Sequence, residues 1–349
     1  MRSDRIKLLD CTLRDGGQGL EAAFRIGTSS VRFTDDTIFR IIEHLVKTDI
    51  DIIELGYVDE NVVCAGHPFA NHSKLLDVSN FIPIRRNKNQ LYISLFTGPN
   101  IDYNDIPEHT PQMVDGTRVI LRYSELQRSI DFCKTLAKRG YKTFVQPMLT
   151  MRYSDDELKM LIEESNSMGA YALYIVDSFG YMKETDIERL FKLFDDGLDL
   201  SIRIGFHAHN NLNLAYSNVQ HFLDISGDRN VIVDSTVSGM GQGAGNLQTE
   251  LILPYLNQEY EKKYNFVELL EVCEQIEPLS SVYQWGYSVI WALPAIYKTA
   301  YKYAMVMRMI RGFSYSKINY VLQHMPDNLR HRYTEENLEL ALKAAGIKE

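Results

Sequence analysis

Two histidines separated by one residue, His207 and His209 in RIGFHAHNN, have the spacing of a metal-chelating pair. If Ile202 to His209 is a strand, residues two apart lie on one face, so both imidazoles point the same way at its end. The following Asn-Asn and a helix start favour a functional place for the pair. The alternative is a pair of surface or core histidines that are bonded to carbonyl groups.

A cluster of charge ends the first apolar run, in the stretch LLDCTLRDGGQG from Leu8 to Gly19. Arg14 and Asp15 lie directly before a glycine pair that stops regular structure, so a strand is predicted to end in charged side chains. The same residues also suit a plain Asp-Gly-Gly turn. The remaining motifs decide between the two interpretations.

A glycine-rich segment, SGMGQGAGNLQTE from Ser238 to Glu250, follows the last predicted strand. Its glycine spacing does not match a dinucleotide-binding loop. Asn246 is predicted at a helix start, where it is either a helix cap or a source of an amide oxygen for a metal.

Eight short apolar or β-branched runs alternate with segments of helical spacing, which indicates parallel strands with helical crossovers. The predicted strands are Ile6 to Asp10, Ile50 to Leu55, Leu91 to Phe96, Arg118 to Leu121, Thr143 to Met148, Ala172 to Val176, Ile202 to His209 and Val231 to Ser235. Eight strands over about 250 residues favour an α/β fold of the (β/α)8 TIM-barrel type. A doubly wound open sheet uses the same alternation with fewer strands.

The chain is predicted to divide into a catalytic barrel, residues 1–258, and a C-terminal helical region, residues 259–349, that packs on it. The helical segments expected there are Phe266 to Ile276, Tyr287 to Arg311, Tyr315 to His324 and Thr334 to Ala345. Between the first strand and its helix, residues 16–32 are expected to form a long loop over the site.

Barrel closure would bring the motifs together, because the first, seventh and eighth strands adjoin in a closed barrel. Asp15, His207, His209 and Asn246 then become neighbours at the carboxyl ends of the strands. Oxygen and imidazole ligands without thiolate suit Mn²⁺, Mg²⁺, Co²⁺ or Zn²⁺ with positions left open for substrate. Such a cation polarises carbonyl oxygens.

The composition of the 349 residues, with 45% hydrophobic and 24% charged, is that of a soluble chain. A formal net charge of -9 disfavours nucleic acid and anionic membranes as partners. The four cysteines are scattered without a CxxC pair, and no apolar run has the length of a membrane span. We therefore expect a cytoplasmic protein whose partners are small molecules or proteins.

Three ordered motifs resemble those of the DRE-TIM metallolyase superfamily, whose members are similar to hydroxymethylglutaryl-CoA lyase. They are DCTLRDGGQ at 10–18, HAH at 207–209 and GMGQGAGN at 239–246. The resemblance covers about residues 1–258, and GFHAHNNLNLA with GMGQGAGN is most similar to the 4-hydroxy-2-oxovalerate aldolase branch.

The resemblance implies that Asp15, His207 and His209 are metal ligands, with Asn246 near the metal or coordinating it. Mn²⁺ or Mg²⁺ is expected first, with Zn²⁺ or Co²⁺ as alternatives.

The resemblance also gives roles to two residues beside the metal. Arg14 would hold the enolate oxygen that develops as a carbon-carbon bond breaks, unless it only forms a salt bridge with Asp10 or Asp15. Glu54, in DIIELG, matches an acidic position of the lyase branch. A buried carboxylate that orients Arg14 or a ligand is the alternative for Glu54.

Gln18 departs from the aldolase pattern, because those enzymes carry a histidine base there and an amide takes no proton at neutral pH. The base is therefore unassigned; the candidates are His67, His72, Glu21 and Tyr287. The cysteine that hydroxymethylglutaryl-CoA lyase carries in its glycine-rich loop has no counterpart in residues 238–250, which disfavours that branch.

Two further features complete the predicted site. Ser178, in VDSFG at the end of the sixth strand, could bond a substrate carboxylate or form a turn with Asp177. The aromatic run from Tyr283 to Tyr303, with Tyr287 among its members, could line a substrate entrance or dock a partner, or bury an amphipathic stripe.

The sequence thus predicts an aldolase that cleaves or forms a bond of a 4-hydroxy-2-oxo acid through a pyruvate enolate. A Claisen-type acyl-CoA condensing enzyme, similar to isopropylmalate or citramalate synthase, is the alternative, and a non-catalytic barrel is a third hypothesis. Self-association is expected to be feasible, and an aldehyde dehydrogenase partner is implied by the resemblance alone.

Overall fold

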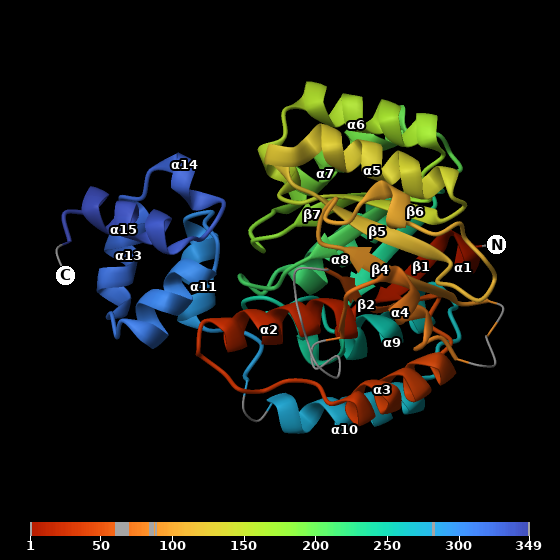
Figure 1. Cartoon of the computed structure of the whole chain (residues 1–349), viewed down its shortest axis with the longest axis horizontal. Helices are drawn as coiled ribbons and strands as arrows, with labels where there is room; N and C mark the ends of the chain where they lie inside the picture. The colour runs from red at the N-terminus through yellow and green to blue at the C-terminus, as the bar shows by residue number, and fades with distance from the viewer. Residues whose placement is uncertain (1, 60–69, 84–86, 88, 281–282, 348–349) are drawn as a thin grey trace.

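The computed structural model describes residues 2–59, 70–83, 87, 89–280 and 283–347. Eight parallel strands close into a barrel in the order β1, β2, β4, β5, β6, β7, β8, β9, and β9 pairs back onto β1 (Figure 1). Their bounds are β1 Ile6–Asp10, β2 Ile52–Val58, β4 Leu91–Phe96, β5 Gly116–Leu121, β6 Lys142–Pro147, β7 Ala172–Asp177, β8 Arg203–Ala208 and β9 Val231–Ser235. A two-residue strand, β3 (Asn71–His72), pairs with β2. The predicted TIM barrel is confirmed.

The strands are buried on both faces, which is why they form apolar runs in the sequence. Within β1, Leu8 belongs to the layer between strands and helices, while Leu9 belongs to the core inside the barrel. The inner core also contains Ile52, Phe144 and Ile232 from other strands. Alternation along each strand thus fills two cores at once.

Helices cover the outside of the barrel (Figure 1). They are α1 Arg2–Arg5, α3 Asp35–Lys47, α4 Leu75–Ser79, α5 Leu126–Lys138, α6 Asp155–Met168, α7 Glu184–Gly197, α8 Ala215–Ile225 and α9 Thr249–Glu259. Ser154 and Glu157 form a capping box at the start of α6, in which each side chain bonds the other's backbone amide.

The expected long loop at residues 16–32 was wrong in its first part. A π-helical turn, Thr12–Gly16, continues directly into helix α2, Gly17–Arg25. The glycines that suggested a loop permit close packing instead. A Cβ atom on Gly19 would collide with the backbone oxygen of Gly241, so this glycine lets α2 rest on the glycine-rich segment.

The C-terminal elements are α10 Phe266–Ser280, α11 Val289–Ile296, α12 Lys302–Met305, a π-helical turn Val306–Ile310, α13 Tyr315–Gln323, α14 Asp327–Arg330 and α15 Glu335–Ala344. Helix α10 lies along α3 and shares the barrel's outer core (Figure 1). Elements α11 to α15 surround a second core. The expected single helix from 287 to 311 is broken after α11, where Lys298 adopts a φ of 52°.

The division at residue 258 stays a prediction, although α10 packs with the barrel.

Among the described helices, none combines the length and apolarity needed to cross a bilayer.

Candidate active site

Arg14 and Asp15 lie in the π-helical turn at the carboxyl end of β1, and both are buried. Nη1 of Arg14 donates to Oδ1 of Asp15 over 2.6 Å, and Nε donates to Oε2 of Glu54 over 2.7 Å. The third guanidinium nitrogen, Nη2, is buried and has no hydrogen-bond partner in the part of the chain that the structure describes. Two carboxylates therefore fix the guanidinium and leave one donor for a ligand.

His207 and His209 stand together at the end of β8, with ring centroids 5.1 Å apart and planes at 86°. Nε2 of His209 lies 4.0 Å from Oδ2 of Asp15. The possible ligand atoms of Asp15, His207 and His209 all lie within 4.8 Å of one another, and all three residues are buried. The fold thus brings the three predicted ligands into one group.

Asn246 joins this group through a β-bridge to His209. Its Nδ2 donates to Oδ2 of Asp15 and to the backbone oxygen of Met240, the latter over 2.9 Å. The expectation that Asn246 begins a helix was wrong, because α9 begins at Thr249, after its N-cap residue Gln248. The backbone amide of Asn246 donates to the oxygen of Gly239 over 3.0 Å, within the glycine-rich segment.

Gly241, in the glycine-rich segment, lies against this group. Its φ is 158°, and an added Cβ atom would lie 2.6 Å from Oδ2 of Asp15 and would also collide with Nδ2 of Asn246. A glycine here therefore serves to bring the backbone against the acidic side chain.

Two buried charged residues that the sequence analysis missed connect the site across the barrel. Asp234, on β9, accepts from Nδ1 of His207 over 3.0 Å. Arg118, on β5, pairs with Asp234 and lies 3.1 Å from Oε1 of Glu54. The signal was a single charge within each otherwise apolar strand, which strands of a parallel barrel seldom bury without a partner.

The electrostatics of the group favour ionised carboxylates and a neutral His209. Burial alone would raise the pKa of Asp234, but the charge of Arg118 and the bond from His207 lower it to about 2. Burial alone would also raise the pKa of Asp15, but the charges of Arg14 and the two histidines hold that pKa below its usual value. Burial lowers the pKa of His209 to about 4, against the opposing charge of Asp15. A neutral imidazole beside a carboxylate is the protonation state that metal binding requires.

The candidates for a base lie on different elements of the chain. Gln18 is half-buried on α2, in the turn after Asp15. Glu21, also on α2, pairs with Arg25 and accepts from the hydroxyl of Tyr57. His72 is buried in β3 with its ring edge against Phe81; His67 lies outside the described residues.

The two predicted substrate-binding residues lie on different parts of the fold. Ser178 is half-buried after β7, and its hydroxyl accepts from the backbone amide of Leu149 over 2.9 Å. Tyr287 lies before α11 and is 64% exposed. Contact of either residue with substrate stays a prediction.

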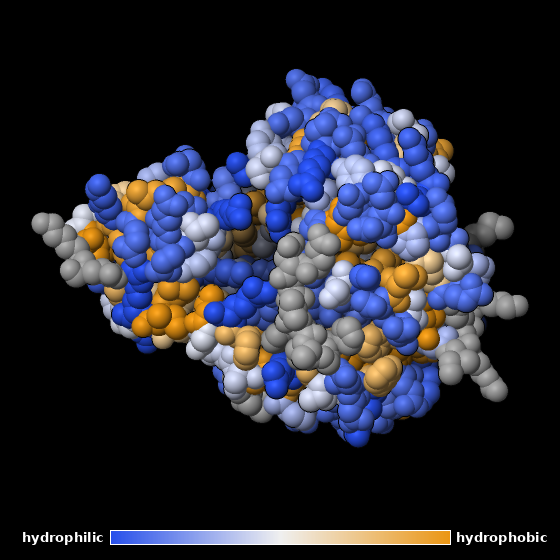
Figure 2. All heavy atoms as spheres, in the orientation of Figure 1, coloured by the Kyte–Doolittle hydropathy of each residue, from blue (hydrophilic) through white to orange (hydrophobic). Residues whose placement is uncertain are grey.

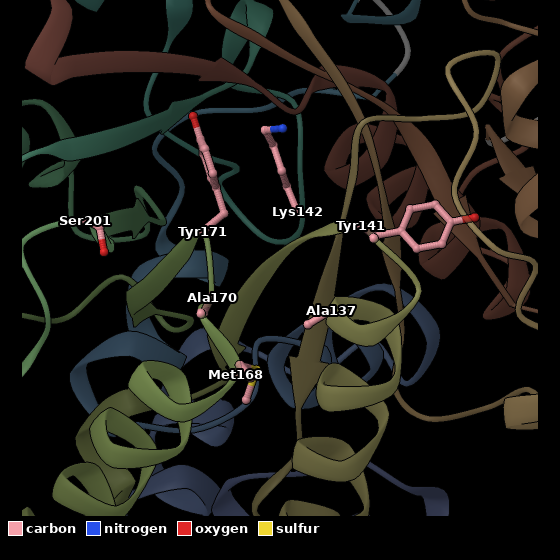
Figure 3. A pocket seen from close by; sticks show the side chains of 9 residues that line it. Ala137, Tyr141, Lys142, Met168, Ala170, Tyr171 and Ser201 are labelled. Atoms are coloured by element: carbon pink, nitrogen blue, oxygen red, sulfur yellow. The ribbon is translucent and has the colours of Figure 1, made fainter.

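The surface offers hollows at both ends of the barrel. Figure 2 shows a recess between the C-terminal helices and the barrel, with hydrophilic side chains around its edge. Another hollow, shown in Figure 3, lies at the starts of β6 and β7, where Lys142 and Tyr171 line it. It faces the amino ends of the strands, the end that serves stability rather than catalysis in TIM barrels.

Residues 118–276 match the HMGL-like family. The chain carries an HMGL-like domain. The resemblance to the DRE-TIM metallolyases is thereby confirmed.

The curated relatives of similar sequence include an aldolase and a decarboxylase. The chain is 28% identical over 285 residues to 4-hydroxy-2-oxovalerate aldolase of Geobacillus genomosp. 3, covering 80% of this chain and 79% of that one. It is 25% identical over 251 residues to oxaloacetate decarboxylase of Mycobacterium tuberculosis, covering 72% and 70%. The solved N-terminal domain of a candidate aldolase from Bacteroides vulgatus superposes with a TM-score of 0.72 at 25% identity, covering 89% and 98%. The names of these relatives support lyase chemistry in general.

Proposed function

We propose that this protein is a divalent-metal-dependent aldolase that cleaves or forms the carbon-carbon bond of a 4-hydroxy-2-oxo acid through a pyruvate enolate. The observation that supports it most is Arg14, whose buried Nη2 has no partner among the described residues although Asp15 and Glu54 fix the rest of the guanidinium. The guanidinium of Arg14 is held in place beside the candidate metal ligands and has one nitrogen free to donate. It can therefore stabilise a substrate oxygen that gains negative charge.

The residues of the group fit a divalent cation. Asp15 offers a carboxylate, His207 and His209 offer imidazoles, and Oδ1 of Asn246 is buried without a hydrogen-bond partner among the described residues. These four would hold the cation, which when bound supplies Lewis acidity to the 2-oxo and carboxylate oxygens of the substrate. The bond from His207 to Asp234 would fix the ring so that its other nitrogen, Nε2, faces the ligand position.

Cleavage requires the 4-hydroxyl to lose its proton while its oxygen forms the new carbonyl group. The pair of electrons of the bond between carbons 3 and 4 passes to carbon 3 and is shared with the oxygen on carbon 2. Carbon 3 then takes up a proton, which gives pyruvate. Arg14 would donate from Nη2 to the oxygen on carbon 2 throughout.

Arg14 suits this role because it keeps its charge. Burial alone would lower its pKa, but the carboxylates of Glu54 and Asp15 raise the pKa above its ordinary value. Gln18 carries no basic group, so we assign it a hydrogen-bonding role at the mouth of the site.

Exchange of the pyruvate methyl protons tests the proposal. The protein is loaded with Mn²⁺, incubated with pyruvate in D₂O and followed by proton NMR. We expect metal-dependent loss of the methyl signal. Exchange of the acetyl protons of acetyl-CoA, without exchange of pyruvate, would favour the Claisen-type alternative. Exchange of neither would favour a non-catalytic barrel.

A further inference from the structure

Asn211 joins two loops at the carboxyl end of the barrel through the two polar atoms of its side chain. The residue follows β8, two positions after His209, and is 3% exposed. Its Nδ2 donates to the backbone oxygen of Phe179 over 3.0 Å, in the loop after β7. Its Oδ1 accepts from the backbone amide of Ala244 over 2.8 Å, in the glycine-rich segment. The oxygen and the nitrogen of this buried amide therefore each hold a different loop.

The glycine-rich segment is shaped to accept this side chain. A Cβ atom on Gly243 would lie 2.7 Å from Oδ1 of Asn211, and Gly243 has a φ of 68°. The glycine therefore permits the segment to lie directly against the side-chain amide. The neighbouring backbone adds a further bond, because the amide of Asn210 donates to the oxygen of Gly245 over 2.8 Å.

The segment that Asn211 holds makes two close approaches to Asp15. Nδ2 of Asn246 donates to Oδ2 of Asp15, and a Cβ atom on Gly241 would lie 2.6 Å from the same oxygen. Ala244 lies between Gly241 and Asn246 in the sequence. A displacement of the Ala244 amide would therefore move the backbone that carries both contacts.

The same segment also receives the C-terminal helical region. The backbone oxygen of Ala244 accepts from the amide of Gly286 over 2.9 Å. Nε1 of Trp285 donates to the backbone oxygen of Gly241 over 3.0 Å. Ala244 is moreover a buried member of the second core, which α11 to α15 surround. Ala244 is thus held by Asn211 through its amide and by Gly286 through its oxygen.

We propose that Asn211 is a positioning residue, which fixes the glycine-rich segment where that segment both contacts Asp15 and receives the C-terminal helical region. This inference rests on the proposed function, because the contact with Asp15 serves the cation that this function requires. Asn211 acts through Ala244 and needs no contact with substrate. Binding of the cation and docking of the C-terminal helical region are then coupled, since each favours the same position of the segment.

The variant Asn211→Leu, compared with Asn218→Leu, separates this role from a general structural one. Asn218, on α8, is also 3% exposed, and its Nδ2 donates to the backbone oxygen of Met182 over 2.9 Å, in the same loop after β7. Both variants should lose thermal stability, because each removes a buried hydrogen bond to a backbone oxygen. Only Asn211→Leu should bind Mn²⁺ about 10-fold to 100-fold more weakly, the range for residues that support a metal ligand. Calorimetric titration measures the affinities.

Hydrogen exchange measures the coupling without substrate. Mn²⁺ should slow the exchange of the Gly286 amide in the wild type and in Asn218→Leu. This protection should be lost in Asn211→Leu, because the link through Ala244 is broken. Mass spectrometry of peptides that contain Gly286 follows the exchange.

The variant Gly243→Ala disturbs the same contact while Asn211 stays in place. Its Cβ atom would push against Oδ1 of Asn211, so the Mn²⁺ affinity should fall at least about 10-fold. Gly312→Ala is the control, because Gly312 has a similar φ of 65° but an added Cβ atom would meet nothing within 4 Å. This pair decides the question if Asn211→Leu fails to fold.

The outcomes distinguish the two proposals. Wild-type protein that binds Mn²⁺ but neither exchanges pyruvate protons nor releases pyruvate would overturn the proposed function, while the affinities of the variants still decide the role of Asn211. Wild-type protein that binds no metal would overturn both. Equal Mn²⁺ affinities in Asn211→Leu and Asn218→Leu would overturn the role of Asn211 alone, as would equal affinities in the two glycine variants. Exchange of the Gly286 amide that does not respond to Mn²⁺ in the wild type would also overturn it.

Discussion

Nδ1 of His207 lies 3.0 Å from Oδ2 of Asp234, on the neighbouring strand of the barrel. The bond to Asp234 fixes the ring of His207, which is one of the predicted metal ligands. Arg118 contacts the same carboxylate and also pairs with Glu54, which holds Arg14. One buried network of charged side chains therefore holds both His207 and Arg14 in place.

Asp234→Asn should weaken metal binding by about 10-fold to 100-fold, the range for residues that orient a histidine ligand. It should also lower the free energy of unfolding by about 3 kcal/mol, because Arg118 loses a buried ionic partner. Metal titration and denaturant unfolding measure both effects. Asp196→Asn, which removes an exposed charge paired with Lys192, is the control. Wild-type metal affinity in Asp234→Asn would contradict the orienting role.

Asp15→Asn should lower the metal affinity at least about 10-fold, because an amide replaces the carboxylate that would neutralise the cation. Metal analysis after gel filtration measures the content that remains. Asp36→Asn serves as the control, since Asp36 forms only an exposed pair with Arg40. An unchanged metal content in Asp15→Asn would remove Asp15 from the ligand set.

Arg14→Lys should keep the metal but lower kcat for cleavage by about 100-fold, since lysine retains the charge without the three-nitrogen fork that reaches Asp15, Glu54 and the open side. Steady-state kinetics and metal analysis on the same preparation measure the two effects. Arg40→Lys, on the surface of α3, is the matched change. If kcat stayed within about 2-fold of the wild type, Arg14 would not hold the enolate.

Gly241→Ala should weaken metal binding at least about 10-fold, because its Cβ atom would push against Asp15 and Asn246. Gly27→Ala is the control: Gly27 also has a positive φ, of 72°, but an added Cβ atom would meet nothing within 4 Å. Gly27→Ala should lower the free energy of unfolding by about 1–2 kcal/mol from backbone strain, and Gly241→Ala by at least as much because its Cβ atom also collides with its neighbours. Equal metal affinities in the two variants would show that the close approach at Gly241 is unimportant for the site.

The barrel could be predicted because each buried strand is an apolar run in the local sequence. The bounds of β1, β4 and β9 coincide with the predicted ones, since an apolar run that is buried on both faces is visible in the local sequence. The grouping of Asp15, His207 and His209 followed from barrel closure together with the motif resemblance.

Features set by contacts across the fold could not be predicted in this way. Helix α2 was not predicted because its glycines suggested a loop. One of them, Gly19, packs against Gly241, which lies more than 200 residues away in the sequence. The pair of Arg118 and Asp234 joins strands 116 residues apart.

Release of pyruvate from 4-hydroxy-2-oxovalerate tests the central claim most directly. The assay couples pyruvate to lactate dehydrogenase and follows the consumption of NADH with the protein as purified, after EDTA treatment and gel filtration, and after Mn²⁺ is restored. We predict that chelation abolishes pyruvate release and that Mn²⁺ restores it in the wild type but not in Asp15→Asn. Pyruvate release that is indifferent to chelation, or absent in the Mn²⁺-restored protein, would contradict a metal-dependent aldolase.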